Sequence, residues 1–247
     1  MAPSNAGAAV DALDLLTRTA LFRNIDSELL HAIYRAAYRK RVRAHEYFFH
    51  QQEEATTFYL LLEGRARLVQ LTPEGHQVTI RYVGPGDAIG IIVALSEVPY
   101  PLSAEAVTDC LALAWDRAAT LRFMEESSAL SLNGLAMVAQ RFRDLQKRYQ
   151  ELATERVERR VARTLLRLTR QTGRRVEEGV LLDLPLSRQD VGELTGTTLY
   201  TVSRILSRWE QEGLISTGRE RIVVCKPHAL VSIAEDLPPQ QPIDKDD

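Results

Sequence analysis

Hydroxyl and guanidinium side chains gather in a short stretch of the chain, at Thr198, Thr201, Ser203 and Arg204. Their spacing places them near the start of a single helix. Hydroxyl groups can hydrogen-bond phosphate oxygens or base edges, and an arginine can make a bidentate contact to guanine. These residue types therefore predict recognition of double-stranded DNA.

An apolar stripe in the same stretch indicates the helix that would hold these groups. Spacings of 3, 1 and 3 separate its members, which are Val202, Ile205, Leu206 and Trp209. The outer faces then carry Leu199, Tyr200, Ser203, Arg204 and Ser207. With the apolar side in a core and the polar start of the helix exposed, the pattern is typical of a recognition helix, at about 198–212.

A second, shorter helix is predicted just before it. Ser187 can cap its start, Asp190 favours the positive end of its dipole, and Gly196 allows the sharp turn between the two helices. A hairpin at 215–225, turning at Thr217-Gly218, follows the pair. The residues expected to contact DNA are Ser187, Arg188, Gln189, Thr198, Tyr200, Thr201, Ser203 and Arg204. The alternative is an ordinary helical hairpin with solvated polar groups.

Charge is unevenly distributed along a chain whose formal net charge is only −2. Between Arg156 and His228, basic residues exceed acidic ones by five, whereas acidic residues are in excess elsewhere. A basic C-terminal segment favours an anion-binding surface.

A long helix is predicted before this segment, because no Gly or Pro occurs between Gly134 and Gly173. Its apolar residues recur at spacings of 3, 4, 3, 4 and 3, and they are Leu135, Val138, Phe142, Leu145, Tyr149 and Leu152. This narrow repeat of 3.5 residues favours a coiled coil between two chains. The alternative is an amphipathic helix packed on its own domain, which usually has a wider stripe.

The N-terminal half combines a helical part, 11–40, with short strands between residues 42 and 116. Apolar or alternating runs separated by turn residues predict strands at 47–50, 58–62, 66–71, 77–83, 88–93, 103–107 and 111–115. Such spacing indicates an antiparallel barrel or sandwich. Residues 1–10 and 236–247 have the composition of loose tails.

Several function classes find no support in the residues. The sequence has no Ser-His-Asp arrangement, no metal-spaced His/Cys cluster and no phosphate-binding glycine loop, so we do not expect an enzyme. Two cysteines suit a reducing cytoplasm, and the start of the chain lacks a signal-peptide pattern. A small-molecule-binding or protein-interaction module without DNA function is the remaining alternative.

Three segments, in this order, resemble the CRP/FNR family of bacterial transcription regulators. They are FYLLLEGRARL at 58–68, VGPGDAIG at 83–90 and GTTLYTVSR at 196–204. The resemblance spans about residues 18–228 and implies an α+β fold. It would comprise a cyclic-nucleotide-binding-type β-roll domain at 11–127, a dimerisation helix at 128–155 and a winged helix-turn-helix domain at 156–235. It also implies a homodimer, a pseudo-palindromic DNA site and RNA polymerase as a partner.

Departures from the family concern mainly the effector. Members that bind cyclic AMP carry Glu, Arg-Ser and Thr-Ser where this chain has Ala88, Leu102-Ser103 and Leu145-Gln146. Without an arginine to neutralise the cyclic phosphate, cyclic AMP is not expected. The two cysteines exclude the four-cysteine iron–sulfur cluster of FNR-type sensors. The five histidines form no ligand motif, which leaves haem as an open alternative.

The effector pocket itself is expected to be apolar. Its predicted lining is Ala88, Ile89, Gly90, Leu102, Ser103 and Leu145.

The recognition helix departs from the family as well, with Leu199-Tyr200 where many relatives have Arg-Glu. The half-site that those relatives read is therefore not assumed for this chain.

Overall fold

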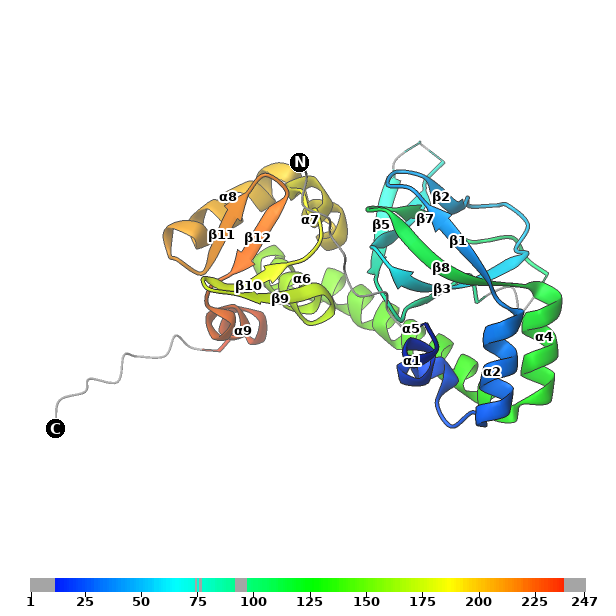
Figure 1. Ribbon diagram of the computed structural model, residues 1–247. Helices are drawn as coiled ribbons and strands as arrows, with labels where there is room; N and C mark the ends of the chain where they lie inside the picture. Colours follow the sequence, from blue (N-terminus) through cyan, green and yellow to red (C-terminus); the bar gives the residue numbers. More distant parts are fainter. Residues whose placement is uncertain (1–11, 74, 76, 92–96, 238–247) are drawn as a thin grey trace, which may run out of the picture. The chain divides into compact units, whose positions relative to one another are not determined.

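The computed structural model describes residues 12–73, 75, 77–91 and 97–237 (Figure 1). The chain divides into two compact units, one ending at Leu145 and the other beginning at Gln146. The division falls within helix α5 (Ser128–Thr154). Of the expected tails, 1–10 and 236–247, only Asp236 and Leu237 are among the described residues.

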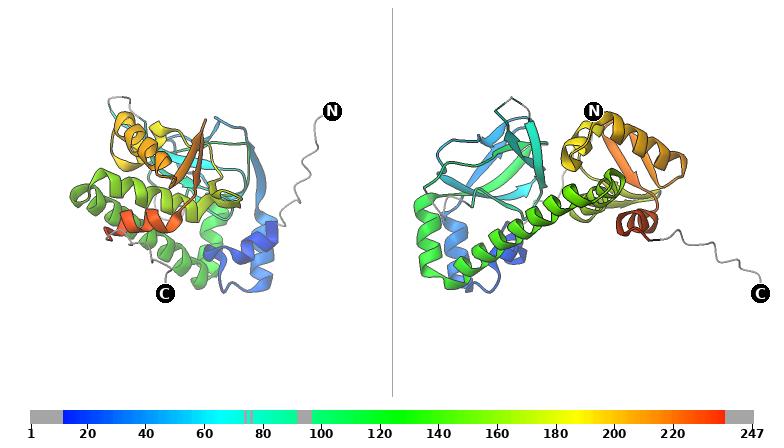
Figure 2. Two further views of the ribbon diagram at one scale, coloured as in Figure 1. Left: turned by 90° about the vertical axis from the view of Figure 1, so that its left-hand side faces the viewer. Right: turned by 180° about the vertical axis from the view of Figure 1, so that it is seen from behind.

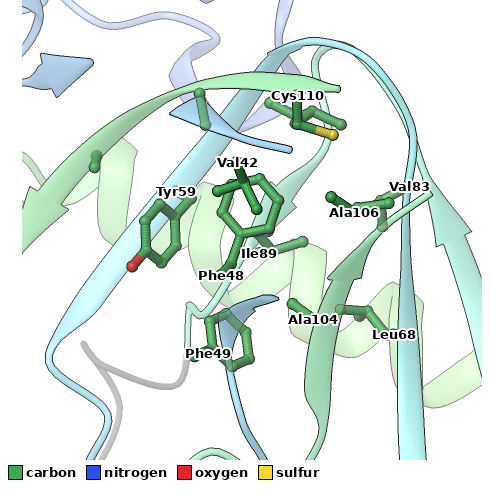
Figure 3. Packing of buried hydrophobic residues seen from close by; sticks show 14 of the residues in the cluster. Val42, Phe48, Phe49, Tyr59, Leu68, Val83, Ile89, Ala104, Ala106 and Cys110 are labelled. Carbon is green, nitrogen blue, oxygen red and sulfur yellow. The ribbon is translucent and has the colours of Figure 1, made fainter. Parts of the chain in front are cut away.

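The N-terminal unit contains two four-stranded antiparallel sheets. Their orders are β1-β8-β3-β6 and β2-β7-β4-β5. The strands are β1 (Tyr38–Val42), β2 (Tyr47–Phe49), β3 (Thr57–Glu63), β4 (Ala66–Leu71), β5 (Gln77–Val83), β6 (Ala88–Ile89), β7 (Ser103–Ala106) and β8 (Cys110–Asp116). Side chains from both sheets meet in an apolar interior that includes Phe48, Tyr59 and Ile89 (Figure 3).

Strand β3 is buried on both faces, which explains its uninterrupted apolar run. Tyr59 and Leu61 point into the interior between the sheets. Phe58, Leu60 and Leu62 point the other way and pack with the helices. One strand thereby joins two hydrophobic cores, since successive side chains alternate between the faces of a sheet.

The helices of this unit cover the outer core. They are α1 (Ala12–Arg18), the 3-10 helix η1 (Ala20–Phe22), α2 (Ser27–Ala36), α4 (Arg117–Glu126) and the first part of α5. Helices α2 and α4 lie side by side in both views of Figure 2. Asp26 caps α2 by accepting hydrogen bonds from the backbone amides of Glu28 and Leu29. The indole of Trp115 donates to the Ile33 carbonyl at 2.8 Å, fastening α2 to the sheet.

The C-terminal unit is a winged helix-turn-helix. It contains α6 (Val157–Thr172), β9 (Gly173–Val176), β10 (Gly179–Leu182), α7 (Arg188–Thr195), α8 (Leu199–Gln211), β11 (Ile215–Gly218), β12 (Arg221–Val224) and α9 (Pro227–Glu235). The strands form one antiparallel sheet in the order β11-β12-β10-β9. Helix α9 packs along α6, and the two lie together in Figure 1. The predicted fold class, a β-roll, a long helix and a winged helix-turn-helix, is confirmed.

The prediction of helix up to residue 40 is wrong at its end. Helix α2 stops at Ala36, and β1 begins at Tyr38 and pairs with Ala114 of β8. The first four residues of β1 are exposed, so the apolar pattern that marks a strand is missing there. Pairing with a strand some seventy residues away overrides the local preference.

Two strand boundaries also differ from expectation. Strand β6 stops at Ile89 because Gly90 takes a φ of +79°, where a Cβ would lie 2.7 Å from the Thr57 carbonyl oxygen. Residues 92 and 93 of the predicted strand lie outside the described residues. In the C-terminal hairpin, Thr217 and Gly218 belong to β11, and the turn falls at Arg219-Glu220, where Glu220 has a φ of +52°.

Candidate nucleic-acid interface

Helix α7 begins with a complete capping box. The Ser187 hydroxyl accepts from the Asp190 amide at 3.1 Å, and the Asp190 carboxylate accepts from the Ser187 amide at 2.8 Å. The same hydroxyl also donates to that carboxylate. The Ser187 side chain is therefore engaged within the protein, which leaves Arg188 and Gln189 as the polar side chains at this helix start.

The turn between α7 and α8 depends on glycine. Gly196 adopts a left-handed conformation, with φ 61° and ψ 44°. A Cβ on this residue would approach the Leu152 side chain to 2.7 Å. Thr198 then caps α8, because its hydroxyl accepts from the Thr201 amide at 3.2 Å.

Helix α8 has a buried face and an exposed face, as its pattern predicts. The buried side chains are Val202, Ile205, Leu206 and Trp209. Trp209 is fully enclosed, and its indole donates to the Glu158 carboxylate of α6 at 3.1 Å. Helix α8 is thereby fixed on the core of the unit, and its other face is free to meet a partner.

The predicted contact residues of α8 lie on the open side of its first two turns. Tyr200 is 78% exposed, and Arg204 is also exposed. Thr201 and Ser203 are half-buried beside them, and the hydroxyl groups of Thr198 and Thr201 lie 3.0 Å apart. Hydrogen-bonding groups at the N-terminal end of such a helix suit base edges and phosphates.

The wing adds a basic residue that the sequence pattern did not single out. Arg219 lies exposed in the turn between β11 and β12. Glu210 of α8 holds this hairpin, since its carboxylate accepts from the Thr217 amide at 2.7 Å. Those hydrogen bonds lower the pKa of Glu210. A basic residue in a tight turn after a helix-turn-helix is the signal that could have identified Arg219.

The predicted dimerisation residues of α5 form a row of exposed apolar side chains. Five of the six are more than half exposed in the single chain, namely Leu135, Phe142, Leu145, Tyr149 and Leu152. Val138 differs, because it is partly buried against the core of the N-terminal unit. Contiguous apolar exposure of this kind marks a surface that associates with another surface.

The predicted effector residues have different surroundings in the N-terminal unit. Ala88 faces the helical core and Ile89 faces the interior between the sheets, on opposite sides of β6. Leu102 packs on that interior, and the Ser103 hydroxyl accepts from the Gln51 amide at 2.8 Å. Leu145 is 60% exposed. The apolar pocket therefore stays a prediction.

Neither a cluster of potential metal ligands nor a membrane-spanning helix occurs in the described parts of the chain. Those residues contain no group of three or more His, Cys, Asp or Glu side chains placed to hold a metal ion. His76 lies outside them. Among the same residues, no helix has the length and apolar character needed to cross a bilayer.

Comparison with known proteins agrees with this architecture. Residues 39–127 match the cyclic nucleotide-binding domain family, and residues 159–233 match the Crp-like helix-turn-helix domain family. The transcriptional regulator LdrP of Thermus thermophilus is 32% identical over 193 residues, covering 77% of this chain and 94% of its own. The anaerobic regulatory protein of Bacillus subtilis is 24% identical, covering 78% and 81%.

Solved structures give the same result. FixK2 from Bradyrhizobium japonicum superposes with a TM-score of 0.71 at 27% identity, covering 80% of this chain and 96% of its own. A CRP-family transcriptional regulator from Thermus thermophilus superposes with a TM-score of 0.68 at 29% identity, covering 79% and 96%.

A β-roll domain joined to a winged helix-turn-helix defines a class of DNA-binding transcription regulators. The chain belongs to this class, and its relatives are transcription regulators. It is a member of the CRP/FNR family.

Proposed function

We propose that this protein is a homodimeric, sequence-specific transcription regulator that reads a pseudo-palindromic DNA site. The observation that carries the proposal is the row of exposed apolar side chains along α5, from Leu135 to Leu152. A 3.5-residue repeat on a 27-residue helix suits a parallel partner helix with the same surface. Two-fold pairing would present two α8 helices to two half-sites about 34 Å apart.

The reading surface consists of the open side of α8. There Arg204 would make a bidentate contact to guanine, and Tyr200 and Ser203 would contact neighbouring base edges. Thr198, whose hydroxyl caps α8, and Thr201 beside it suit phosphate oxygens, as do Arg188 and Gln189 at the start of α7. Because Ser187 is engaged in its capping box, its contribution is to hold Arg188 in place.

Cyclic AMP is not the effector in this proposal. Some relatives are named as cyclic AMP-dependent, such as the cyclic AMP receptor protein of Thermus thermophilus, 30% identical. In this chain Leu102 stands where the phosphate-binding arginine is expected, and it packs on apolar side chains. A cyclic phosphate placed there would lose its hydration without gaining a cation. We expect cyclic AMP to leave DNA affinity unchanged.

In this proposal, separate segments of the chain carry the separate roles. The β-roll domain occupies 11–127, the dimerisation helix 128–155 and the DNA-binding domain 156–235. RNA polymerase is the expected protein partner at the bound site. Binding of an effector in the β-roll domain would shift α5. This shift would reposition the segment near Ala153–Arg156, where α5 ends and α6 begins.

Selection from random-sequence duplexes with the full-length protein tests the DNA site. The expected result is an enriched inverted repeat whose half-site centres lie about one helical turn, or about 10 base pairs, apart. Selection repeated with Tyr200→Ala should retain the spacing but change the preferred bases. Recovery of no inverted repeat would overturn the proposal.

A further inference from the structure

An arginine-lined hollow of about 450 Å³ lies in the N-terminal unit, between η1, the β5–β6 turn and α5. Its four guanidinium groups come from Arg23, Arg81, Arg141 and Arg143. Of the six predicted effector residues it shares only Ala88, since Ile89, Gly90, Leu102, Ser103 and Leu145 do not line it. We propose that this hollow binds a small molecule bearing a phosphate group.

Arg141 is the anchor of the proposed site. Its Nη2 group donates to the Ala88 carbonyl oxygen and lies 3.4 Å from the Met137 sulfur. Its Nε–H is buried and has no hydrogen-bond partner among the described residues. A buried donor without an acceptor is costly, and an oxyanion in the hollow would supply one.

The charges of the hollow match a dianion. Only two carboxylates, those of Asp87 and Asp144, line it beside the four arginines. Asp87 is held by Arg81 at 3.0 Å and by the Gly84 amide at 2.9 Å. Two positive charges remain uncompensated, and a phosphate monoester carries a charge of about −2 at neutral pH.

Repulsion between the arginines supports the same conclusion. Burial first, and then the positive charge of Arg81, lower the pKa of Arg141 to about 10. Arg23 is exposed at the rim, and its side chain has no ion-pair partner in the described part of the chain. A bound phosphate would relieve the repulsion and could accept paired hydrogen bonds from these guanidinium groups.

The hollow would remain open in the proposed dimer. Its α5 lining, from Asn133 to Asp144, includes Ala136, Met137 and Gln140. With about 100° of rotation per residue, these positions fall on the face opposite Leu135, Phe142 and Leu145. A ligand could therefore enter whether or not α5 is paired, and the proposal does not rest on the function proposed above.

Calorimetric titration of the full-length protein tests the site without DNA, with inorganic phosphate and pyrophosphate as probes at constant ionic strength in chloride. We expect saturable binding of one pyrophosphate per chain, weakened about tenfold or more by Arg141→Gln. Arg23→Gln should also weaken it, and because Arg23 is exposed this variant should fold even if Arg141→Gln does not. Arg18→Gln, an exposed change outside the hollow, is the matched control.

Three results would overturn the proposal. One is the absence of saturable pyrophosphate binding, and another is unchanged affinity in Arg23→Gln. The third is equal binding of succinate, which would mean that the arginines accept any dianion instead of a phosphate.

Discussion

The guanidinium group of Arg160 donates a hydrogen bond to the carbonyl oxygen of Thr195 at 3.0 Å, where helix α7 ends. The same side chain donates to the Gly196 carbonyl at 3.4 Å and to the Glu155 carbonyl at 2.8 Å. Arg160 thus joins the junction between α5 and α6 to the turn before the recognition helix. A cation at a helix C-terminus also complements the helix dipole.

Arg160→Gln should therefore lower the free energy of unfolding by about 2 kcal/mol, because charge-assisted hydrogen bonds to these carbonyl oxygens are lost. Urea unfolding followed by circular dichroism measures the change. Arg174→Gln, an exposed position on β9, should leave the midpoint nearly unchanged. Equal midpoints for the two variants would mean that the Arg160 contacts contribute nothing to stability.

Loss of the capping box at the start of α7 should also destabilise the protein. Ser187→Ala removes the acceptor for the Asp190 amide, which costs about 1 kcal/mol. Thermal unfolding measures the effect, with Ser207→Ala on the open side of α8 as the control. A stability loss no larger than that of the control would contradict the capping role.

Two arginines of the helix-turn-helix should separate base reading from phosphate binding. Arg204→Ala should weaken the selected site by about 1–3 kcal/mol while hardly changing affinity for random DNA. Arg188→Ala should weaken binding to the selected site and to random DNA alike, and should reduce the salt dependence of binding. Fluorescence anisotropy at several salt concentrations distinguishes the two. Parallel losses on cognate and random DNA in both variants would refute the assigned roles.

Leu145→Asp should disrupt association of two chains, because it places a charge in the middle of the apolar row of α5. Sedimentation equilibrium should show dimers for the unaltered protein and monomers for the variant. Lys147→Glu, which changes charge away from that row, is the control. A Leu145→Asp protein that stays dimeric and binds its site with full affinity would exclude pairing through α5.

The two cysteines should differ in reactivity. Burial raises the pKa of Cys110 to about 11, so that at pH 8 only about one thiol in a thousand is ionised. Cys225 is only half-buried. Iodoacetamide at pH 8 should therefore modify Cys225 and spare Cys110 in the folded protein, as peptide mass spectrometry can show. In urea both should react, and rapid native modification of Cys110 would contradict the described packing.

The elements that the sequence predicts well are those whose signal is local. The apolar stripe of α8, which ends at Trp209, determines which face of the helix is buried and which is exposed. Gly196 marks the turn between α7 and α8. Strand β1 escapes prediction because its exposed residues acquire their structure from distant β8.

The contacts that hold the candidate sites escaped prediction for a related reason. Arg160 and Thr195 are 35 positions apart, and nothing in the sequence around either residue indicates the other. The arginines of the hollow come from three separate segments that only the folded unit brings together.

In the proposed complex, two chains paired along α5 place two α8 helices on one DNA site. Native mass spectrometry of the protein bound to a duplex with one selected inverted repeat tests it most directly. We expect two protein chains per duplex, and one chain or none when Leu145→Asp is used. A stable complex of one unaltered chain with the whole repeat would contradict it.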